Sequence, residues 1–106
     1  MAKTINLTYE GTQYTLEFTR KSIETMERNG FAVDDLNTKP MSTLPVLFAG
    51  AFLANHRYMK RDVIDKIFTH LTNKQEFFEK LAEMFSEPME ALLDENEGNV
   101  QWGAAW

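Results

Sequence analysis

The sequence predicts an α+β domain in which an N-terminal β-hairpin is followed by a small bundle of about four helices. Residues 4–18 alternate apolar and polar side chains around a glycine-containing turn, which is typical of a hairpin. Residues 44–54 are apolar on every side, which indicates a helix buried in the core. Residues 77–93 carry an apolar stripe opposite a row of glutamates, which indicates an amphipathic helix. The length of 106 residues fits one domain.

The hairpin is predicted to turn at Glu10-Gly11-Thr12 and to place six apolar side chains on one face. These are Ile5, Leu7, Tyr9, Tyr14, Leu16 and Phe18. Because an isolated hairpin is only marginally stable in water, this face should lie on the helices or on a partner.

A short helix is predicted from Arg20 to Asn29. Thr19 suits its N-cap, and Gly30 suits the left-handed residue that follows many helices. Phe31 is then expected to make the apolar contact that accompanies such an ending. Residues 34–41 are expected to form a loop, because aspartates and asparagine cluster there and the Lys-Pro step disfavours helix.

The apolar helix is predicted to run from Leu44 to Ala54. Pro45 suits its first turn, with the Ser-Thr pair at 42–43 as N-cap. The Gly-Ala pair at 50–51 offers a small-residue face that a neighbouring element can approach closely. Eleven residues are far too few to cross a bilayer, which takes about 20.

Two further helices are expected after the basic residues Arg57, Lys60 and Arg61. The first spans 62–71 and the second is capped by Asn73. Pro88 interrupts the second, and an interior proline kinks or breaks a helix at a cost of about 3 kcal/mol. Since the apolar stripe keeps its phase through this proline, the sequence favours a kink, or a restart capped by Ser86, over a true break.

The chain is expected to divide into a single domain, residues 1–93, and a flexible, acidic, tryptophan-containing tail, residues 94–106. The net charge of −5 is unevenly distributed along it. The first 75 residues carry ten Lys/Arg and eight Asp/Glu, whereas the remainder carries one Lys and eight Asp/Glu. An acidic chain repels the phosphate backbone, so nucleic-acid binding is disfavoured despite the three basic residues after the apolar helix.

The sequence does not predict an enzyme. It has no cysteine, which excludes disulfides and thiolate metal sites, and neither cofactor nor metal is expected. Its two histidines, His56 and His70, do not have a metal-ligand spacing, and no glycine-rich phosphate loop or nucleophile elbow is present. The first residues lack the apolar core of a signal peptide, so secretion is not expected.

The apolar stripe of the last helix is the candidate partner-binding surface. Met84, Phe85 and Met89, together with Trp102 and Trp106, are expected to be hard to bury in so small a domain. Methionine is over-used on adaptable binding surfaces. An amphipathic helix of this kind either completes its own core or engages a partner helix, and both interpretations stay open. The tail is either without a role or a binding segment.

Three stretches of the sequence carry a resemblance to a known family. They are INLTYEGTQYTLEFTRKSIETMERNGF, then PVLFAGAFLANHR, and an ending made of an amphipathic helix, an acidic break and a tryptophan-containing tail. Over nearly its whole length the chain resembles the small tail assembly chaperones of long-tailed bacteriophages of Gram-positive hosts and of their prophages.

The resemblance implies a non-enzymatic protein of the bacterial cytoplasm. Such chaperones bind the tape measure protein, keep it soluble while tail tube subunits polymerise around it, and are absent from the finished virion. Many are made in two lengths by a ribosomal frameshift, and this chain looks like the short form. An extended form would be the one to recruit the tail tube protein.

A tape measure protein is a long helical chain with apolar stripes, which the stripe of the last helix could cover. The expected contact residues are Phe77, Leu81, Met84, Phe85, Met89 and Leu92, with Trp102 as a tail anchor. The alternatives are a head–tail or tail component retained in the virion and, against the net charge, a small nucleic-acid-binding regulator. Self-association through the hairpin edge or the apolar stripe stays open, and no membrane partner is expected.

Overall fold

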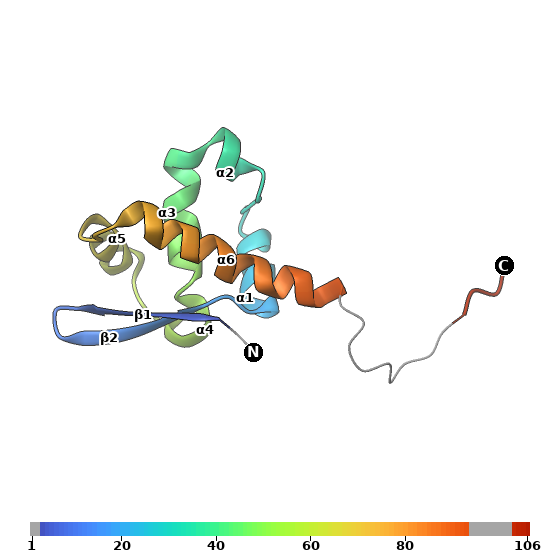
Figure 1. The fold of residues 1–106 in the computed structure, drawn as a ribbon, viewed down its shortest axis with the longest axis horizontal. Coiled ribbons are helices and arrows are strands. Elements are labelled where there is room, and N and C mark those ends of the chain that lie inside the picture. Colours follow the sequence, from blue (N-terminus) through green and yellow to red (C-terminus); the bar gives the residue numbers. More distant parts are fainter. Residues whose placement is uncertain (1–2, 94–102) are drawn as a thin grey trace.

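The fold is α+β, as the sequence predicts: a two-stranded antiparallel hairpin followed by six helices (Figure 1). The computed structural model describes residues 3–93 and 103–106. The elements are β1 (Thr4–Tyr9), β2 (Thr12–Glu17), α1 (Arg20–Arg28), α2 (Asp35–Thr38), α3 (Pro40–Gly50), α4 (Leu53–His56), α5 (Arg61–Thr69) and α6 (Lys74–Leu93). Because α2 and α4 are four-residue turns of helix, the four longer helices correspond to the bundle predicted from the sequence.

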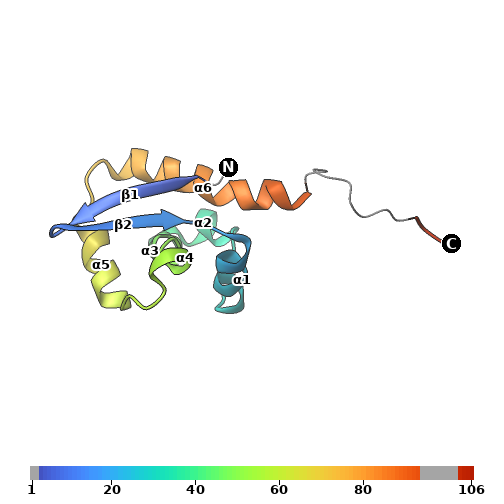
Figure 2. The same cartoon turned by 90° about the horizontal axis from the view of Figure 1, so that it is seen from below.

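The hairpin and α6 run in roughly the same direction, with α3 crossing α6 (Figure 1). Seen from below, α1, α4 and α5 lie on one side of β2, while α6 lies on the side of β1 (Figure 2). In both views the last turns of α6 extend beyond the other elements. The helix therefore has one part inside the fold and one part outside it.

The hairpin forms as predicted, with a two-residue turn at Glu10 and Gly11. Both residues have positive φ, 50° and 79°, which matches the turn that best fits the twist of paired strands. The register pairs Ile5 with Leu16 and Leu7 with Tyr14, so the apolar side chains lie on one face. Leu16 is fully buried there. The prediction that this face packs on the helices is confirmed.

The outer edge of β2 is held by α4 and by the turn before it. The backbone N–H of Thr15 donates to His56 Nε2 at 3.0 Å, and the N–H of Glu17 donates to the Ala51 carbonyl at 3.0 Å. Asn55 Nδ2 donates to the Thr15 carbonyl at 3.3 Å. An exposed strand edge is a template for unwanted pairing, and these bonds occupy it.

Helix α1 begins and ends on the predicted residues to within one position. Thr19 and Ser22 form a reciprocal capping box, each side chain accepting from the other residue's backbone N–H. At the other end Gly30 has φ 99°, and the Phe31 N–H donates to the Met26 carbonyl at 3.0 Å. This is the Schellman ending expected from the Gly-Phe step.

Two predictions are wrong in the segment that follows α1: the loop at residues 34–41 and the place of Pro45 in the first turn of the apolar helix. Residues 34–41 are not a loop throughout, because α2 forms there and α3 already begins at Pro40, with Lys39 as its N-cap. Pro40 therefore takes the first-turn position that the sequence assigned to Pro45, which lies inside the helix. The carbonyl that Pro45 deprives of a donor belongs to Met41, which is 91% exposed, so water can satisfy it.

The apolar helix also ends earlier than predicted, at Gly50, and resumes as α4 after Ala51 and Phe52. The interruption directs the Ala51 carbonyl to the N–H of Glu17 in β2, a long-range bond that no local pattern predicts. The predicted close approach at Gly50 is present: a Cβ at this position would overlap Met26 of α1.

The core centres on Phe48 of α3. Its ring centroid lies 5.2 Å from that of Phe52, 5.5 Å from that of Phe68 in α5 and 5.6 Å from that of Phe77 in α6. Aromatic pairs at such separations contribute about 0.5–1.5 kcal/mol each beyond the burial of their area. One side chain therefore joins three helices.

Helix α6 runs without interruption through Pro88, so neither a break nor a restart is present. Ser86 Oγ donates back to the Glu83 carbonyl at 2.9 Å instead of capping a new helix. The N-terminus of the chain is joined to this region, because the backbone N–H of Lys3 donates to Glu87 Oε1 at 3.0 Å.

Replacing Thr19 by Ala removes half of the capping box and is expected to lower the free energy of unfolding by about 1 kcal/mol. The matched control is Thr25→Ala in the same helix, where the hydroxyl only bonds back to the Lys21 carbonyl. Denaturant unfolding of both variants measures the difference. Equal stabilities would show that the capping box does not stabilise α1.

Candidate partner-binding surfaces

The predicted contact stripe divides into a buried part and an exposed part. Leu81, Met84 and Phe85 are at most 7% exposed, and Phe77 is half-buried against Phe48. The expectation that Met84 and Phe85 are hard to bury is therefore wrong. Phe85 is covered from two sides, because its ring lies 5.0 Å from that of Phe18 and 5.7 Å from that of Phe31. Leu81, Met84 and Phe85 are accessible to a partner only if α6 leaves the domain.

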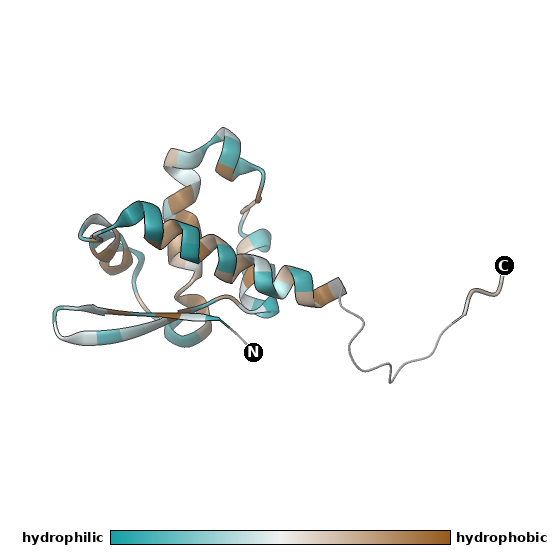
Figure 3. Ribbon diagram, in the orientation of Figure 1, coloured by the Kyte–Doolittle hydropathy of each residue, from teal (hydrophilic) through white to brown (hydrophobic). Residues whose placement is uncertain are grey.

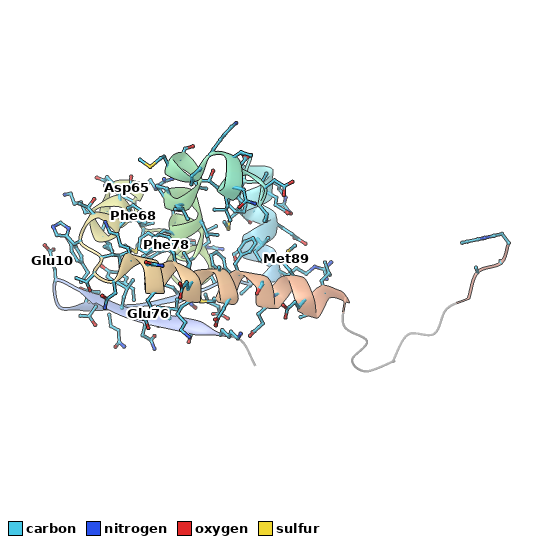
Figure 4. The ribbon with its side chains drawn as sticks, turned by 45° about the horizontal axis from the view of Figure 1, so that its top comes forward. Glu10, Asp65, Phe68, Glu76, Phe78 and Met89 are labelled. Atoms are coloured by element: carbon cyan, nitrogen blue, oxygen red, sulfur yellow. The ribbon has the colours of Figure 1, made fainter. Side chains whose placement is uncertain are left out.

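The exposed part lies where α6 extends past the core. Met89 is 43% exposed and Leu92 is 54% exposed. Their spacing from Leu81 and Phe85 continues the same apolar face of the helix for two more turns. Figure 4 shows Met89 well separated from Phe68 and Phe78, which lie close together near the start of α6. We call Met89 and Leu92, with the neighbouring Glu83, Glu87 and Glu90, the α6 end.

Hydropathy is unequally distributed on α6. In the view of Figure 3 most of the helix is hydrophilic, and apolar residues reappear at its C-terminal end. No Lys or Arg follows Lys80 in the sequence, so the helix beyond Lys80 carries only negative charges, while Lys80 itself lies 4.0 Å from Glu83 and Glu87 accepts the backbone N–H of Lys3. The predicted tail anchor, Trp102, lies outside the described residues, and Gly103–Trp106 form neither helix nor strand.

A second surface surrounds α4. Three adjoining hollows share residues there and have volumes of about 610, 430 and 340 Å³. They lie between α1, α3, α4 and the start of α5, and every charged residue that the structure places in their lining is basic. We call this surface the α4 groove and define it by Lys21, Met26, Leu53, Arg57, Met59 and Arg61.

An exposed aromatic–arginine pair stands at the rim of this groove. Arg57 Nη2 donates to the Tyr58 hydroxyl at 2.9 Å, and its guanidinium lies 5.0 Å from the centre of the Tyr58 ring. Tyr58 itself is 85% exposed. Tyrosine and arginine are the residues that dominate binding energy at many protein interfaces. The sequence indicated the basic residues but not the groove, because its walls come from separate elements.

The two histidines take part in structural contacts. His56 accepts the Thr15 N–H, while His70 lies against the Tyr9 ring at 5.7 Å and has Nδ1 2.8 Å from the Lys66 carbonyl. Over residues 3–93 and 103–106 no group of three or more His, Asp or Glu is placed to hold a metal ion. Within the same residues no helix combines the length and apolarity that crossing a membrane requires.

The whole chain, residues 1–106, matches a protein family described as a domain of unknown function (DUF5055), and the protein belongs to this family. No curated protein and no solved structure matches the chain. The family description names no ligand, partner or reaction. The α6 end and the α4 groove are therefore the features of the molecule that bear on its function.

Because the stripe has a buried part and an exposed part, two similar substitutions are expected to change the stability of the protein by very different amounts. Leu81→Ala empties a fully buried site and is expected to cost about 2–5 kcal/mol of stability, whereas Leu92→Ala on the same helix should change it by no more than about 0.5 kcal/mol. Thermal or denaturant unfolding measures both. A large loss for Leu92→Ala would place that side chain in the core and remove it from the α6 end.

Proposed function

We propose that the protein is a tail assembly chaperone, a non-enzymatic protein of the bacterial cytoplasm that binds a tape measure protein and keeps it soluble. The observation that carries the proposal is the α6 end. This helix completes the core with its middle turns and then presents Met89 and Leu92 to solvent beside glutamates. Exposed apolar side chains with a polar rim are typical of protein interaction sites.

The α6 end has the chemistry that an aggregation-prone helical client requires. Apolar residues recurring along a client helix can pack on Met89 and Leu92, as amphipathic helices do when they bind one another. Glu83, Glu87 and Glu90 remain beside the contact, and their charge keeps the complex soluble and repels other complexes. Binding of the chaperone thus covers an apolar stripe of the client and leaves an acidic surface exposed to solvent.

The free energy of one such contact is small, so stable binding requires many copies of the chaperone on one client. Full burial of a Met or Leu side chain stabilises by about 1.5–3 kcal/mol, and both residues are already about half covered. One α6 end therefore contributes only about 1.5–3 kcal/mol from apolar burial. A long client with repeated apolar segments compensates, because it binds several copies along its length.

Co-expression with a tape measure protein, as the expected client, tests the proposal. The client is expected to become soluble and to co-purify with many copies of the chaperone. Met89→Glu combined with Leu92→Glu should lower the affinity of each copy by about 30-fold, equivalent to about 2 kcal/mol, and return the client to the insoluble fraction.

Met41→Glu is the matched control, because Met41 is more exposed than Met89 but lies at the start of α3. It should leave client solubility unchanged. Loss of solubility with this control would indicate a general effect of surface charge. A client that stays insoluble beside abundant, folded wild-type protein would contradict the proposed function.

Mass spectrometry of purified virions separates the proposed chaperone from the alternative, a structural head–tail component. A chaperone leaves before assembly is complete and should be absent from the particle. Detection of the protein at stoichiometric amounts in virions would assign it to the particle instead.

A further inference from the structure

We propose that the α6 end of one copy docks into the α4 groove of a second copy, so that the protein associates head to tail with itself. The inference rests on the chemistry of the two surfaces and does not depend on the identity of the client. It commits to one occupant for the groove, namely the acidic, apolar end of α6 from another molecule.

The charges of the two surfaces are complementary. The α4 groove is lined by Lys21, Arg57 and Arg61, with no acidic residue among the described lining. Only Arg61 of these three forms an ion pair among the described residues, with Asp65 at 2.9 Å. The α6 end carries Glu83, Glu87 and Glu90, of which Glu83 already pairs with Lys80 at 4.0 Å, so Glu87 and Glu90 are its acids without an ion pair among the described residues. Opposite potentials of this kind steer association and fix its orientation.

The apolar side chains of the α6 end also fit the apolar hollow of the α4 groove. Apart from Asn29 and Arg61, the hollow of about 340 Å³ is lined by aliphatic residues, glycine and methionines, including Met26, Leu53 and Met59. A closed apolar cavity of about 150 Å³ is large enough to bind benzene, so this hollow has room for more than one aliphatic side chain. Met89 and Leu92, one helical turn apart, would enter it together. Methionines on the groove wall can adapt their shape to them.

The placement of the two surfaces decides the symmetry of the contact. α4 lies beside β2 among α1 and α5, whereas the end of α6 projects away from all of these elements (Figures 1 and 2). A continuous helix cannot turn back to fill the groove of its own molecule. Because the two surfaces differ, the contact is heterologous, and repeating it produces a ring or an open chain of copies.

The first experiment is analytical ultracentrifugation of the full chain from about 10 to 500 μM at low and high salt. Two apolar side chains and a few charges predict weak association, with a Kd of roughly 10–100 μM. Self-association should increase with concentration and weaken as salt screens the charges. A wild-type protein that is monomeric over the whole range overturns the inference.

Two sets of variants then test the two surfaces separately. The groove variant is Lys21→Glu with Arg57→Glu, and the α6-end variant is Met89→Gln with Leu92→Gln. Each is expected to be monomeric alone, since each retains only one functional surface. Mixing them should produce a one-to-one heterodimer that does not grow further, because the intact groove of one variant accepts the intact α6 end of the other.

Control variants separate a specific loss of the contact from a general change of surface polarity or from unfolding. Met41→Gln removes a larger exposed apolar surface elsewhere and should self-associate like the wild type. Circular dichroism and melting verify folding, and the neutral pair Lys21→Gln with Arg57→Gln replaces the groove variant if the charge reversal unfolds it. Self-association that persists in the groove variant, or a mixture that stays monomeric, overturns the inference.

Client binding distinguishes this inference from the proposed function. The groove variant should still solubilise the client, because its α6 end is intact, while the α6-end variant should lose both properties. Failure of wild-type self-association with normal client solubility overturns only the head-to-tail contact. Failure to solubilise the client with normal self-association overturns only the chaperone role.

Discussion

The packing of Phe48 holds α3, α5 and α6 together. This fully buried ring contacts aromatic rings from α5 and α6, and through Phe52 the same cluster reaches Tyr14 of the hairpin, 6.0 Å away. Removing a buried phenylalanine typically costs about 3–5 kcal/mol, a large part of the stability of a small domain. Because this cluster helps to fix the buried turns of α6 in the core, it also determines the direction in which the last turns of the helix project.

The projecting last turns give α6 a second role that does not interfere with its role in the core. Leu81, Met84 and Phe85 are the part of the apolar stripe that is buried inside the domain. Met89 and Leu92 remain exposed, because no element of the described chain covers them. The fold therefore does not need to open in order to present apolar surface. If the α6 end also binds the groove of a second copy, client and neighbouring copy compete for it, and self-association covers Met89 and Leu92 until a client is present.

Sequence reasoning succeeded where the determinants are local. The hairpin turn requires only Glu10 and Gly11 at positive φ, and α1 is delimited by Thr19 and Gly30, which act on their immediate neighbours. It failed where tertiary contacts decide. The end of α3 depends on a bond from distant Glu17, and the burial of Phe85 depends on rings from two other segments. The α4 groove could not be predicted, because its wall combines α1, α3, α4 and α5, and only their packing brings Lys21 near Arg57.

Hydrogen–deuterium exchange along α6, with and without the client, tests whether this helix binds through its projecting end while its middle stays in the core. In the free protein, amides near Leu81–Phe85 should be well protected and those near Met89–Leu92 should exchange faster. The client should slow exchange near Met89–Leu92 and leave the buried turns unchanged. Faster exchange at Leu81–Phe85 on client binding would contradict the account, because it would mean that α6 opens and that the buried stripe is the contact surface.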